Sequence, residues 1–247
     1  MRYLLVAAAL LCAAAPAAAQ MSPTAAVADQ QRPAEDRALD AGRKPAEVLA
    51  MMGLKPGMAV LDLVAGSGYY SELIADVVGP KGEVVATNPA GLASRYAEMW
   101  KARVARHPNI TPVQRTGQET STPPANRFDA AMMHLIYHDF YWESAQFNIP
   151  RIDPQQILGR LYAELKPGGT VLVVDHVANP GGDTRKVVNE LHRIDPATIR
   201  ADFERAGFKL AGTSNILRVS SDDHTKLVFD KSVRGNTDRV IYRFVKP

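Results

Sequence analysis

A short segment, HLIYHD, concentrates side chains that can accept a proton from a substrate. Its candidate bases are Tyr137, His138 and Asp139, and His138 ranks first because an imidazole titrates near neutral pH. The alternative for His138 is a structural role, in which its ring caps a turn or bonds a backbone carbonyl. Farther along the chain, His192 and Arg193 can line a substrate pocket from the other side.

The same segment also contains potential metal ligands. His134 and His138 are four residues apart and Asp139 follows them, while His176 and Glu119 are further potential ligands. On one helix, such a histidine pair would be a good ligand set. Because His134 is expected to end a strand, the pair would not share a helix face. We therefore predict that the chain has no metal site.

A second stretch with chemical potential is AVLDLVAGSGYYS, residues 59–71. Gly66 and Gly68 let the backbone turn sharply after an apolar strand and approach a ligand closely. The third glycine of the dinucleotide fingerprint would fall at Ser71, and no Gly-Lys-Ser or Gly-Lys-Thr of a P-loop follows. The loop therefore fits a cofactor without a phosphate better than NAD, and an NAD-dependent oxidoreductase is only a distant alternative.

The elements that must position these residues alternate between strands and helices. Short apolar runs typical of buried strands lie at 60–64, 82–88, 109–113, 128–134, 170–175, 208–219 and 239–245. Helical patterns lie between them, at 70–77, 89–105, 154–165 and 196–207, and another precedes them from Pro45. This alternation predicts an α/β fold, a doubly wound, mostly parallel, seven-stranded sheet with helices on both faces. The site is then expected at the carboxyl ends of the central strands.

The composition is that of a soluble globular protein. The chain has 247 residues, of which 46% are hydrophobic and 22% charged. A net charge of +3 is small, and its Lys and Arg residues are scattered, so we expect no nucleic acid partner. Nothing in the sequence indicates an oligomeric state.

The first residues have the layout of a secretory signal peptide. MRYLLVAAALLCAAAPAAAQ has a charged start, an apolar stretch and small residues before a cut after Ala19, and Ala26-Val27-Ala28 is a second possible cut site. We therefore expect a signal peptide at 1–19, a flexible terminus at 20–31 and a single domain at 32–247. The protein is expected to be exported, to the periplasm, with no membrane span once the leader is cleaved. Cleavage also removes Cys12, the chain's one cysteine.

Several segments, taken in chain order, resemble the core motifs of class I S-adenosylmethionine-dependent methyltransferases. They are VLDLVAGSGYYSELIA, GEVVATNP, FDAAMMHLIYHD, LYAELKPGGTVLVVDH and IRADFERAGFKL. The LKPGG turn before a valine-rich strand and the later AGF are the most specific of them. The chain further resembles an exported subgroup of predicted methyltransferases through RPAEDRALDAGRKPAEVL, YHDF, HRIDPATIR and RGNTDRVIYRFVKP.

The resemblance implies S-adenosylmethionine as the cofactor, and it assigns residues to the cofactor's parts. The loop would hold the methionine end, with the N–H groups of Gly66 and Gly68 meeting the carboxylate and Asp62 assisting the amine. Asn88 would contact the ribose, Gln118 the adenine, and His134 would lie beside the sulfonium. The complete set of expected cofactor residues is Asp62, Val64, Ala65, Gly66, Ser67, Gly68, Asn88, Gln118 and His134.

The expected function is transfer of a methyl group to a small-molecule acceptor, an in-line displacement that needs alignment and proton removal. Three residues depart from the family pattern. Val64 replaces a glycine, and Asn88 and Gln118 replace acids, which keeps hydrogen bonding but removes charge. These departures predict weaker cofactor binding. They also support an alternative function, an exported non-catalytic binding protein that retains the methyltransferase fold.

Overall fold

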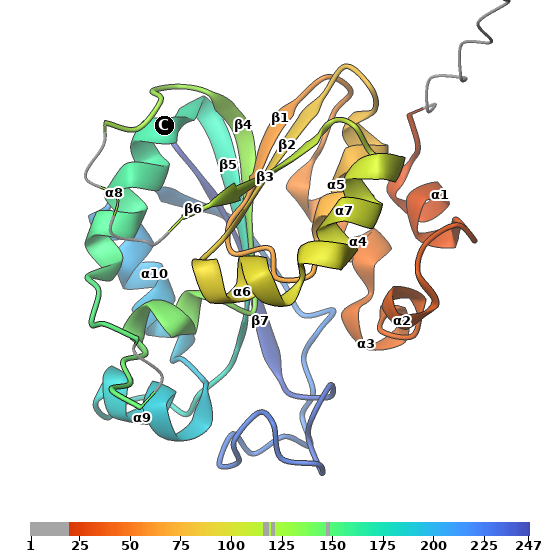
Figure 1. The fold of residues 1–247 in the computed structure, drawn as a ribbon. Helices are drawn as coiled ribbons and strands as arrows, with labels where there is room; N and C mark the ends of the chain where they lie inside the picture. The colour runs from red at the N-terminus through yellow and green to blue at the C-terminus, as the bar shows by residue number, and fades with distance from the viewer. Residues whose placement is uncertain (1–19, 116–118, 120–121, 147–148) are drawn as a thin grey trace, which may run out of the picture.

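The computed structural model describes residues 20–115, 119, 122–146 and 149–247. Their strands form one sheet in the order β3-β2-β1-β4-β5-β7-β6 (Figure 1). The strands are β1 Ala59–Asp62, β2 Glu83–Asn88, β3 Ile110–Gln114, β4 Phe128–His134, β5 Leu165–His176, β6 Lys209–Ser214 and β7 Arg239–Val245. Neighbours are parallel except at β7, which runs antiparallel to β5 and β6. The predicted α/β fold with a mostly parallel, seven-stranded sheet is confirmed.

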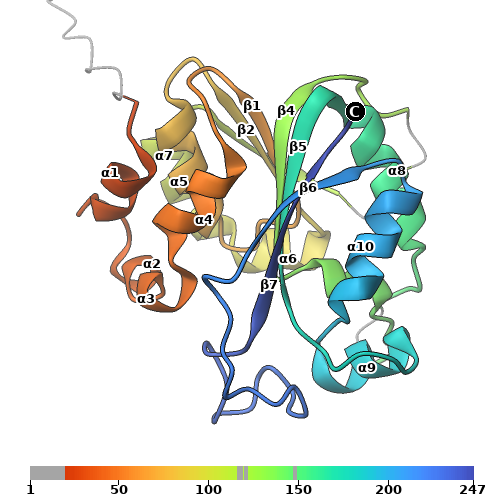
Figure 2. The ribbon, with the colours of Figure 1, turned by 180° about the vertical axis from the view of Figure 1, so that it is seen from behind.

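Helices cover both faces of the sheet, as expected of a doubly wound fold (Figure 1, Figure 2). One face carries α1 Pro23–Ala28, α4 Pro45–Met52, α5 Tyr69–Val78 and α7 Ala97–Arg106, and the other carries α8 Pro154–Glu164 and α10 Pro196–Arg205. The shorter helices are α2 Ala34–Arg37, α3 Asp40–Arg43, α6 Ala90–Arg95, α9 Thr184–Leu191 and the 3-10 helix η1 Tyr137–Tyr141.

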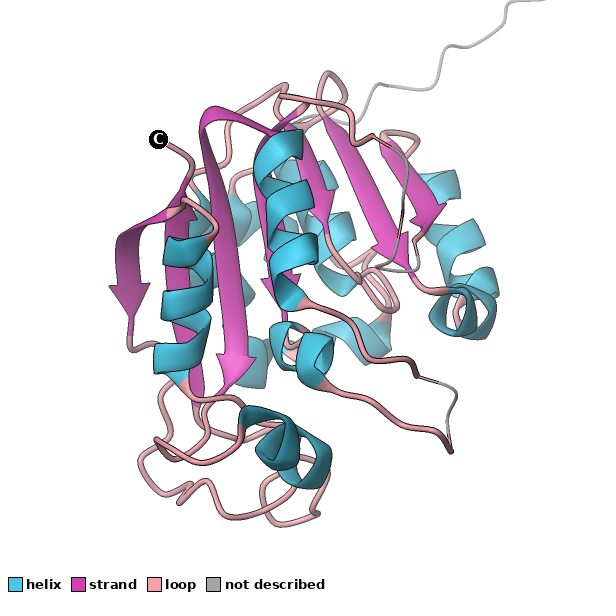
Figure 3. Ribbon diagram, turned by 90° about the vertical axis from the view of Figure 1, so that its left-hand side faces the viewer, coloured by secondary structure: helices cyan, strands magenta, loops and turns pink. Residues whose placement is uncertain are grey.

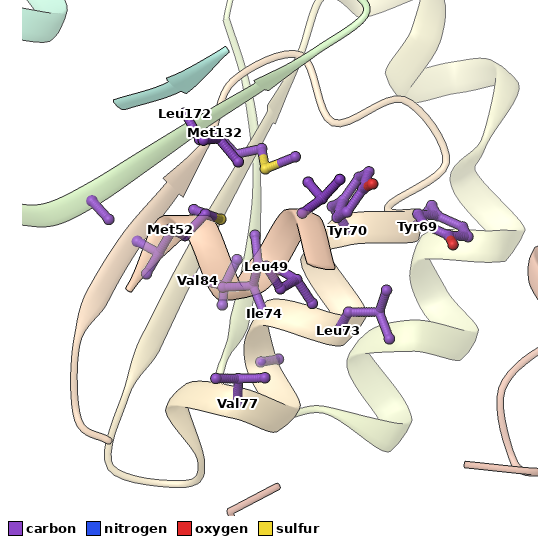
Figure 4. Packing of buried hydrophobic residues seen from close by; sticks show 14 of the residues in the cluster. Leu49, Met52, Tyr69, Tyr70, Leu73, Ile74, Val77, Val84, Met132 and Leu172 are labelled. Carbon is purple, nitrogen blue, oxygen red and sulfur yellow. The ribbon is translucent and has the colours of Figure 1, made fainter. Parts of the chain in front are cut away.

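Each face of the sheet has its own cluster of buried apolar side chains. Figure 4 shows the cluster beneath α4 and α5, in which Leu49 and Ile74 face Val84 and Met132 of the strands. These side chains are almost completely withdrawn from water. Because burial of apolar surface is the main favourable term in folding, the two clusters fix the helices against the sheet.

Several helix boundaries follow directly from the local sequence. Asp153 and Asp195 are N-caps whose carboxylates accept hydrogen bonds from backbone N–H groups two residues later, and a proline follows each of them. Gly53 ends α4 in the left-handed conformation that it adopts without strain. All three boundaries were predicted from the sequence.

The prediction of a flexible segment at 20–31 is wrong. Ser22 caps α1, which packs against α4 and α5, and Ala26 is completely buried. Short alanine side chains let this helix approach its neighbours closely, a property that composition alone did not reveal. The helix expected at 89–105 is interrupted at Tyr96, which divides it into α6 and α7.

The parallel strands end at one edge of the sheet, where η1, α9 and the long segment 215–238 gather (Figure 3). This edge is where ligands bind in open α/β sheets. Among the described residues, no helix combines the length and hydropathy that crossing a membrane requires.

Candidate functional site

The loop of residues 63–68 joins β1 to α5 at this edge of the sheet. Its backbone is left-handed at Val64 (φ 55°), Gly66 (φ 59°) and Gly68 (φ 87°). Glycine adopts this conformation at no steric cost, whereas for a β-branched residue it is an outlier. Val64 therefore stands at a position with the backbone geometry of a glycine.

Asn88, the last residue of β2, clamps the loop. Its Nδ2 donates to the Gly66 carbonyl and its Oδ1 accepts from the Gly66 N–H, both at 2.9 Å. Nε1 of Trp100, in α7, donates to the same carbonyl at 3.0 Å. Both ends of the amide are therefore engaged with one loop residue, and Asn88 is buried.

Arg103, also in α7, braces the next part of the loop. Its Nε donates to the Ser67 carbonyl at 2.6 Å, and its guanidinium forms ion pairs with the carboxylates of Glu72 and Asp36. A Cβ on Gly68 would lie only 2.9 Å from Arg103 Cδ. The glycine at 68 is thus required both by its positive φ and by the arginine packed against it.

The N–H groups of the loop are engaged within the protein. Gly66 donates to Asn88, Gly68 donates to the Ala65 carbonyl at 2.9 Å, and Ala65 donates to the Thr87 carbonyl at 2.9 Å. In this conformation the two glycine N–H groups are therefore not directed at a cofactor carboxylate, the contact that the resemblance implies and that stays a prediction. The physical reason is that Asn88 and the Ala65 carbonyl supply acceptors from the protein itself.

Asp62, the last residue of β1, is buried beside this loop. Its Oδ2 accepts a hydrogen bond from Ser71 Oγ at 2.6 Å. Burial raises the pKa of Asp62 to about 6, and the Ser71 hydrogen bond opposes part of that rise. The carboxyl group is therefore poised to change charge just below neutral pH.

His134 and Tyr70 form a neutral polar pair next to the loop. Their ring centroids lie 4.6 Å apart. His134 Nε2 and Tyr70 Oη are both buried without a hydrogen-bond partner in the part of the chain that the structure describes. Burial first, and then the charges of Arg43 and Arg239, hold the pKa of His134 well below its ordinary value. Two unpaired buried atoms indicate a place that a polar ligand can complete.

His138 lies in a second group of side chains, at the ends of β4 and β5. Its Nδ1 is 2.7 Å from Asp175 Oδ1, and its Nε2 is 3.2 Å from Asp139 Oδ1. His192 Nδ1, at the end of α9, is 3.3 Å from the same oxygen of Asp139. The group thus joins residues from three separate elements.

The surroundings of His138 change its expected chemistry. Burial favours the neutral ring, but the charges of Asp175 and Asp139 outweigh it and raise the pKa of His138 to about 10. The ring therefore holds its proton at neutral pH, which argues against His138 as the base. Its bond to a carboxylate also differs from the turn-capping role considered as the alternative.

Two further predicted site residues have structural roles. Tyr137 is completely buried, and its Oη donates to Asp202 at 2.9 Å, so its hydroxyl is not exposed at this edge of the sheet. Arg193 is also completely buried, and it pairs with Asp222 through two hydrogen bonds. Of the pair predicted to line a pocket, only His192 joins the group around His138.

Part of the sequence matches a known family. The model of the family "Protein-L-isoaspartate(D-aspartate) O-methyltransferase (PCMT)" matches residues 29–102, which include the 63–68 loop and Asn88. A protein-L-isoaspartate O-methyltransferase of Methanothermobacter thermautotrophicus is 29% identical over 85 residues, 34% of this chain and 39% of that protein. The ubiquinone/menaquinone biosynthesis C-methyltransferase UbiE of Cupriavidus necator is 26% identical over 127 residues, 51% of this chain and 46% of that protein. The chain spans less than half the length of either relative.

Solved structures match over most of the chain. A SAM-dependent methyltransferase from Aquifex aeolicus has a TM-score of 0.59 and 21% identity, covering 85% of this chain and 97% of that one. The chain has the class I methyltransferase fold. Haemonchus contortus phosphoethanolamine N-methyltransferase 2, in complex with S-adenosyl-L-methionine, has a TM-score of 0.57 and 16% identity, covering 83% of this chain and 52% of that one. The [4+2]-cyclase SpnF matches with a TM-score of 0.57 and 18% identity, covering 89% and 85% of the two chains.

Within this methyltransferase fold, the structure brings most of the predicted cofactor residues together. Asp62 ends β1, the residues from Val64 to Gly68 follow it, Asn88 ends β2 and His134 ends β4. Gln118 lies outside the described residues. The cofactor residues assigned by resemblance therefore remain predictions that share one edge of the sheet.

Sequence reasoning missed the residues that hold the loop and the histidine. Trp100 and Arg103 are three apart on α7, a spacing that places them on one helix face. Asp175 is the penultimate residue of β5, the strand next to β4, and it contacts both the Nδ1 and the backbone N–H of His138. The spacing within α7 was a usable signal, whereas the Asp175 contact joins residues distant in the sequence.

The clamp on the loop makes one substitution informative. Asn88→Asp restores the acid that the family usually has, but it replaces the Nδ2 donor by an oxygen that faces the Gly66 carbonyl. We expect the free energy of unfolding to fall by about 1–2 kcal/mol, because a buried acceptor loses its donor. Urea unfolding at pH 7 measures this loss. Equal stability of Asn88→Asp and the unsubstituted chain would contradict the clamp.

Proposed function

We propose that the chain binds S-adenosylmethionine and transfers its methyl group to a small-molecule acceptor. The observation that carries this proposal is the 63–68 loop, with left-handed backbone at Val64, Gly66 and Gly68 directly after β1. In the methyltransferase fold this position is the carboxyl end of a central strand, where such a sheet receives its ligand. The phosphoethanolamine enzyme among its structural neighbours supports a small acceptor.

The residues around the loop fit this cofactor. His134 Nε2 and Tyr70 Oη are buried atoms without partners in the described chain, and Asp62 supplies a carboxylate for an amino group. When bound, S-adenosylmethionine supplies an electrophilic methyl group on a positively charged sulfur. A neutral imidazole at His134 suits this position, because a second positive charge beside the sulfur would repel it.

The acceptor side of the proposed site is formed by the group around His138. The positive charge of the His138 ring holds the Asp139 carboxylate, which also faces His192. Asp139 and His192 are partly exposed, whereas the ring of His138 is buried. We therefore assign contact with the acceptor to Asp139 and His192, and the positioning of Asp139 to His138.

Isothermal titration of the chain from Gln20 onward with S-adenosylmethionine and S-adenosylhomocysteine tests the proposed function. Saturable binding of both compounds at one site per chain is expected. The absence of binding heat at millimolar ligand would overturn the proposal. His138→Gln is expected to lower turnover more than cofactor affinity, since its ring acts on the acceptor side.

Val64→Gly is expected to raise the affinity for S-adenosylhomocysteine about tenfold. The substitution gives the loop the residue that suits a φ of 55° and removes side-chain bulk where the cofactor would pass. A tenfold change corresponds to about 1.4 kcal/mol of binding free energy. Titration calorimetry of both proteins under the same conditions measures the ratio of dissociation constants.

Val64→Ala is the matched control, because alanine removes two methyl groups but keeps a Cβ at the left-handed position. We expect it to gain less affinity than the glycine variant. If both substitutions leave the affinity unchanged, Val64 does not obstruct the cofactor and its conformation needs another explanation.

The second candidate function is an exported binding protein without catalytic activity. The engaged N–H groups of Gly66 and Gly68 and the engaged amide of Asn88 favour it, because these groups would otherwise contact a cofactor. The structural match to a [4+2]-cyclase shows that this fold is not restricted to one chemistry. Cofactor or its product co-purifying from cytoplasmic expression without residues 1–19 favours the methyltransferase.

The proposed location is outside the cytoplasm, in the periplasm. The basis is the leader pattern of residues 1–19, with Arg2 before an apolar stretch and Ala19 before the cut. Fractionation of cells that express the whole chain tests this location, and a shorter product in the periplasmic fraction is expected. Recovery of an uncleaved chain from the cytoplasm alone would contradict it.

A further inference from the structure

Three side chains at the ends of β4 and α9 bring metal-binding atoms together. His138 and Asp139 come from η1, and His192 is the C-cap of α9. One ligand atom from each of them lies within 4.8 Å of the other two. The sequence does not group His192 with the other two as a ligand, because more than 50 residues separate it from His138 and only the fold joins them.

The two distances to Asp139 Oδ1 match those between ligand atoms around a transition-metal ion. His138 Nε2 and His192 Nδ1 lie 3.2 and 3.3 Å from Asp139 Oδ1. Ligand bonds of about 2.0–2.2 Å in tetrahedral geometry place neighbouring ligand atoms about 3.4 Å apart. Asp139 Oδ1 is itself buried and makes no hydrogen bond to any residue that the structure describes. This oxygen sits at ion-pair distance from two imidazole nitrogens, as a metal ligand would.

The orientation of His138 is fixed from its other side. Asp175 Oδ1 lies 2.7 Å from His138 Nδ1, and its second oxygen accepts the backbone N–H of His138 at 2.9 Å. Because this carboxylate keeps a proton on Nδ1, a metal ion would displace only the proton on Nε2, and the lone pair that is freed would face the ion. Carboxylate–histidine–metal arrangements of this kind set the tautomer and ring orientation of metal-binding histidines.

His192 is held in an unusual backbone conformation. Its φ of 49° is left-handed, which a residue with a Cβ adopts only when its surroundings determine it. Trp142 and Phe229 lie on its ring, with centroid distances of 5.0 and 5.2 Å. The strained backbone and the two aromatic contacts present its Nδ1 to Asp139.

The charge of the cluster also suits a cation. Asp175 is completely buried and Asp139 is partly buried. Among the described residues, only imidazoles lie within ion-pair distance of these two carboxylates. Buried charges are normally paired or coordinate a metal. The 31% exposed side chain of Asp139 leaves a route for an ion from solvent.

We propose that His138 Nε2, an Asp139 carboxylate oxygen and His192 Nδ1 bind a divalent transition-metal ion of the zinc type, with Asp175 orienting His138. Two imidazoles and one carboxylate are a ligand set for such ions, and three protein ligands leave one coordination position open. The proposal departs from the prediction of no metal site. That prediction weighed His134, His138, Asp139, His176 and Glu119. Only His138 and Asp139 of these belong to the ligand set, and His192 was not among them.

Zinc titration of the untagged chain from Gln20 onward, freed of metal by a chelator and then dialysed, tests the proposed site. We expect one Zn²⁺ per chain with a dissociation constant below about 1 μM, and at least 100-fold weaker binding of Mg²⁺, which prefers oxygen ligands. His192→Asn is expected to weaken zinc binding at least tenfold. Asparagine tolerates the left-handed backbone, so the variant removes the imidazole without adding strain.

His224→Asn is the matched control. His224 is also left-handed, with a φ of 63°, and also contacts a carboxylate, that of Asp238 at 2.9 Å, but it lies outside the proposed site. Zinc should raise the melting temperature of the unsubstituted chain and of this control, and raise that of His192→Asn much less. Asp139→Asn provides a second ligand variant and is expected to behave like His192→Asn.

The absence of stoichiometric zinc binding would overturn the proposal and leave an imidazolium paired with two carboxylates. Equal zinc affinity of the His192→Asn and His224→Asn variants would overturn it as well. Because the titration uses zinc alone, its outcome does not depend on whether the chain binds S-adenosylmethionine.

Discussion

Arg103→Met is expected to lower the free energy of unfolding by about 3–5 kcal/mol, the usual cost of removing one partner from a buried ion pair. The Arg103 side chain is 1% exposed and pairs with the carboxylates of Glu72 and Asp36. Methionine fills similar space but leaves the Asp36 carboxylate buried without that cation. The Ser67 carbonyl of the loop also loses its donor. Urea unfolding monitored by circular dichroism measures the loss.

Glu72 does not cancel this effect, although it keeps another partner. Burial alone would raise the pKa of Glu72, but the hydrogen bond from His107 and the charges of Arg103 and Arg106 outweigh it and lower that pKa to about 2. Arg106, whose guanidinium lies 2.8 Å from Glu72 in the structure, remains as a partner of Glu72 when Arg103 is replaced. The larger part of the expected loss therefore arises at Asp36 and at the loop.

Arg127→Met is the matched control for Arg103→Met. Arg127 forms an ion pair with Glu83 in which both side chains are 41% exposed. Exposed pairs contribute about 0–1 kcal/mol, because water solvates the charges in either case. If Arg103→Met costs no more than Arg127→Met, Arg103 does not brace the loop as its contacts indicate.

The parts of the fold that local sequence determines were predictable. The alternation of apolar runs and helical patterns predicted the sheet. The capping side chains of Asp153 and Asp195 predicted where two helices begin. The helix α1 begins with the same local signal, the Ser22 cap followed by Pro23, but its packing on α4 and α5 appears only in the structure. Ala26 looks like a linker residue until that neighbouring surface is known.

In the candidate site too, the features that depend on local sequence were predictable, and the contacts between distant residues were not. Gly66 and Gly68 indicated a ligand loop because a positive φ is a local requirement that glycine meets. The contact of Asn88 with Gly66 and that of His138 with the Asp175 carboxylate depend on which strands are neighbours, so no local pattern reveals them. The ranking of His138 as a base could not take account of the two carboxylates that set its charge, for the same reason.

Asp62 is expected to make stability depend on pH in the direction opposite to most carboxylates. Burial raises its pKa in the folded chain to about 6, above the ordinary 3.8 of an aspartate. Between these two values the folded state binds more protons than the unfolded state. The contribution of Asp62 to stability is therefore complete below about pH 4 and is lost as the pH rises through about 6. The whole shift corresponds to about 3 kcal/mol, of which about 2 kcal/mol falls between pH 4.5 and pH 8.

Comparison of Asp62→Asn with the unsubstituted chain isolates this contribution, because every other titrating group is common to both proteins. Relative to the unsubstituted chain, the variant should gain about 2 kcal/mol of unfolding free energy when the pH is raised from 4.5 to 8. Urea unfolding at the two pH values measures the difference. Ser71→Ala is the companion variant: it removes the hydrogen bond that lowers the pKa of Asp62, so the pH dependence should become steeper. A stability difference between Asp62→Asn and the unsubstituted chain that does not change with pH would show that the Asp62 carboxyl is solvated in the folded protein, and that the β1 edge is open to water.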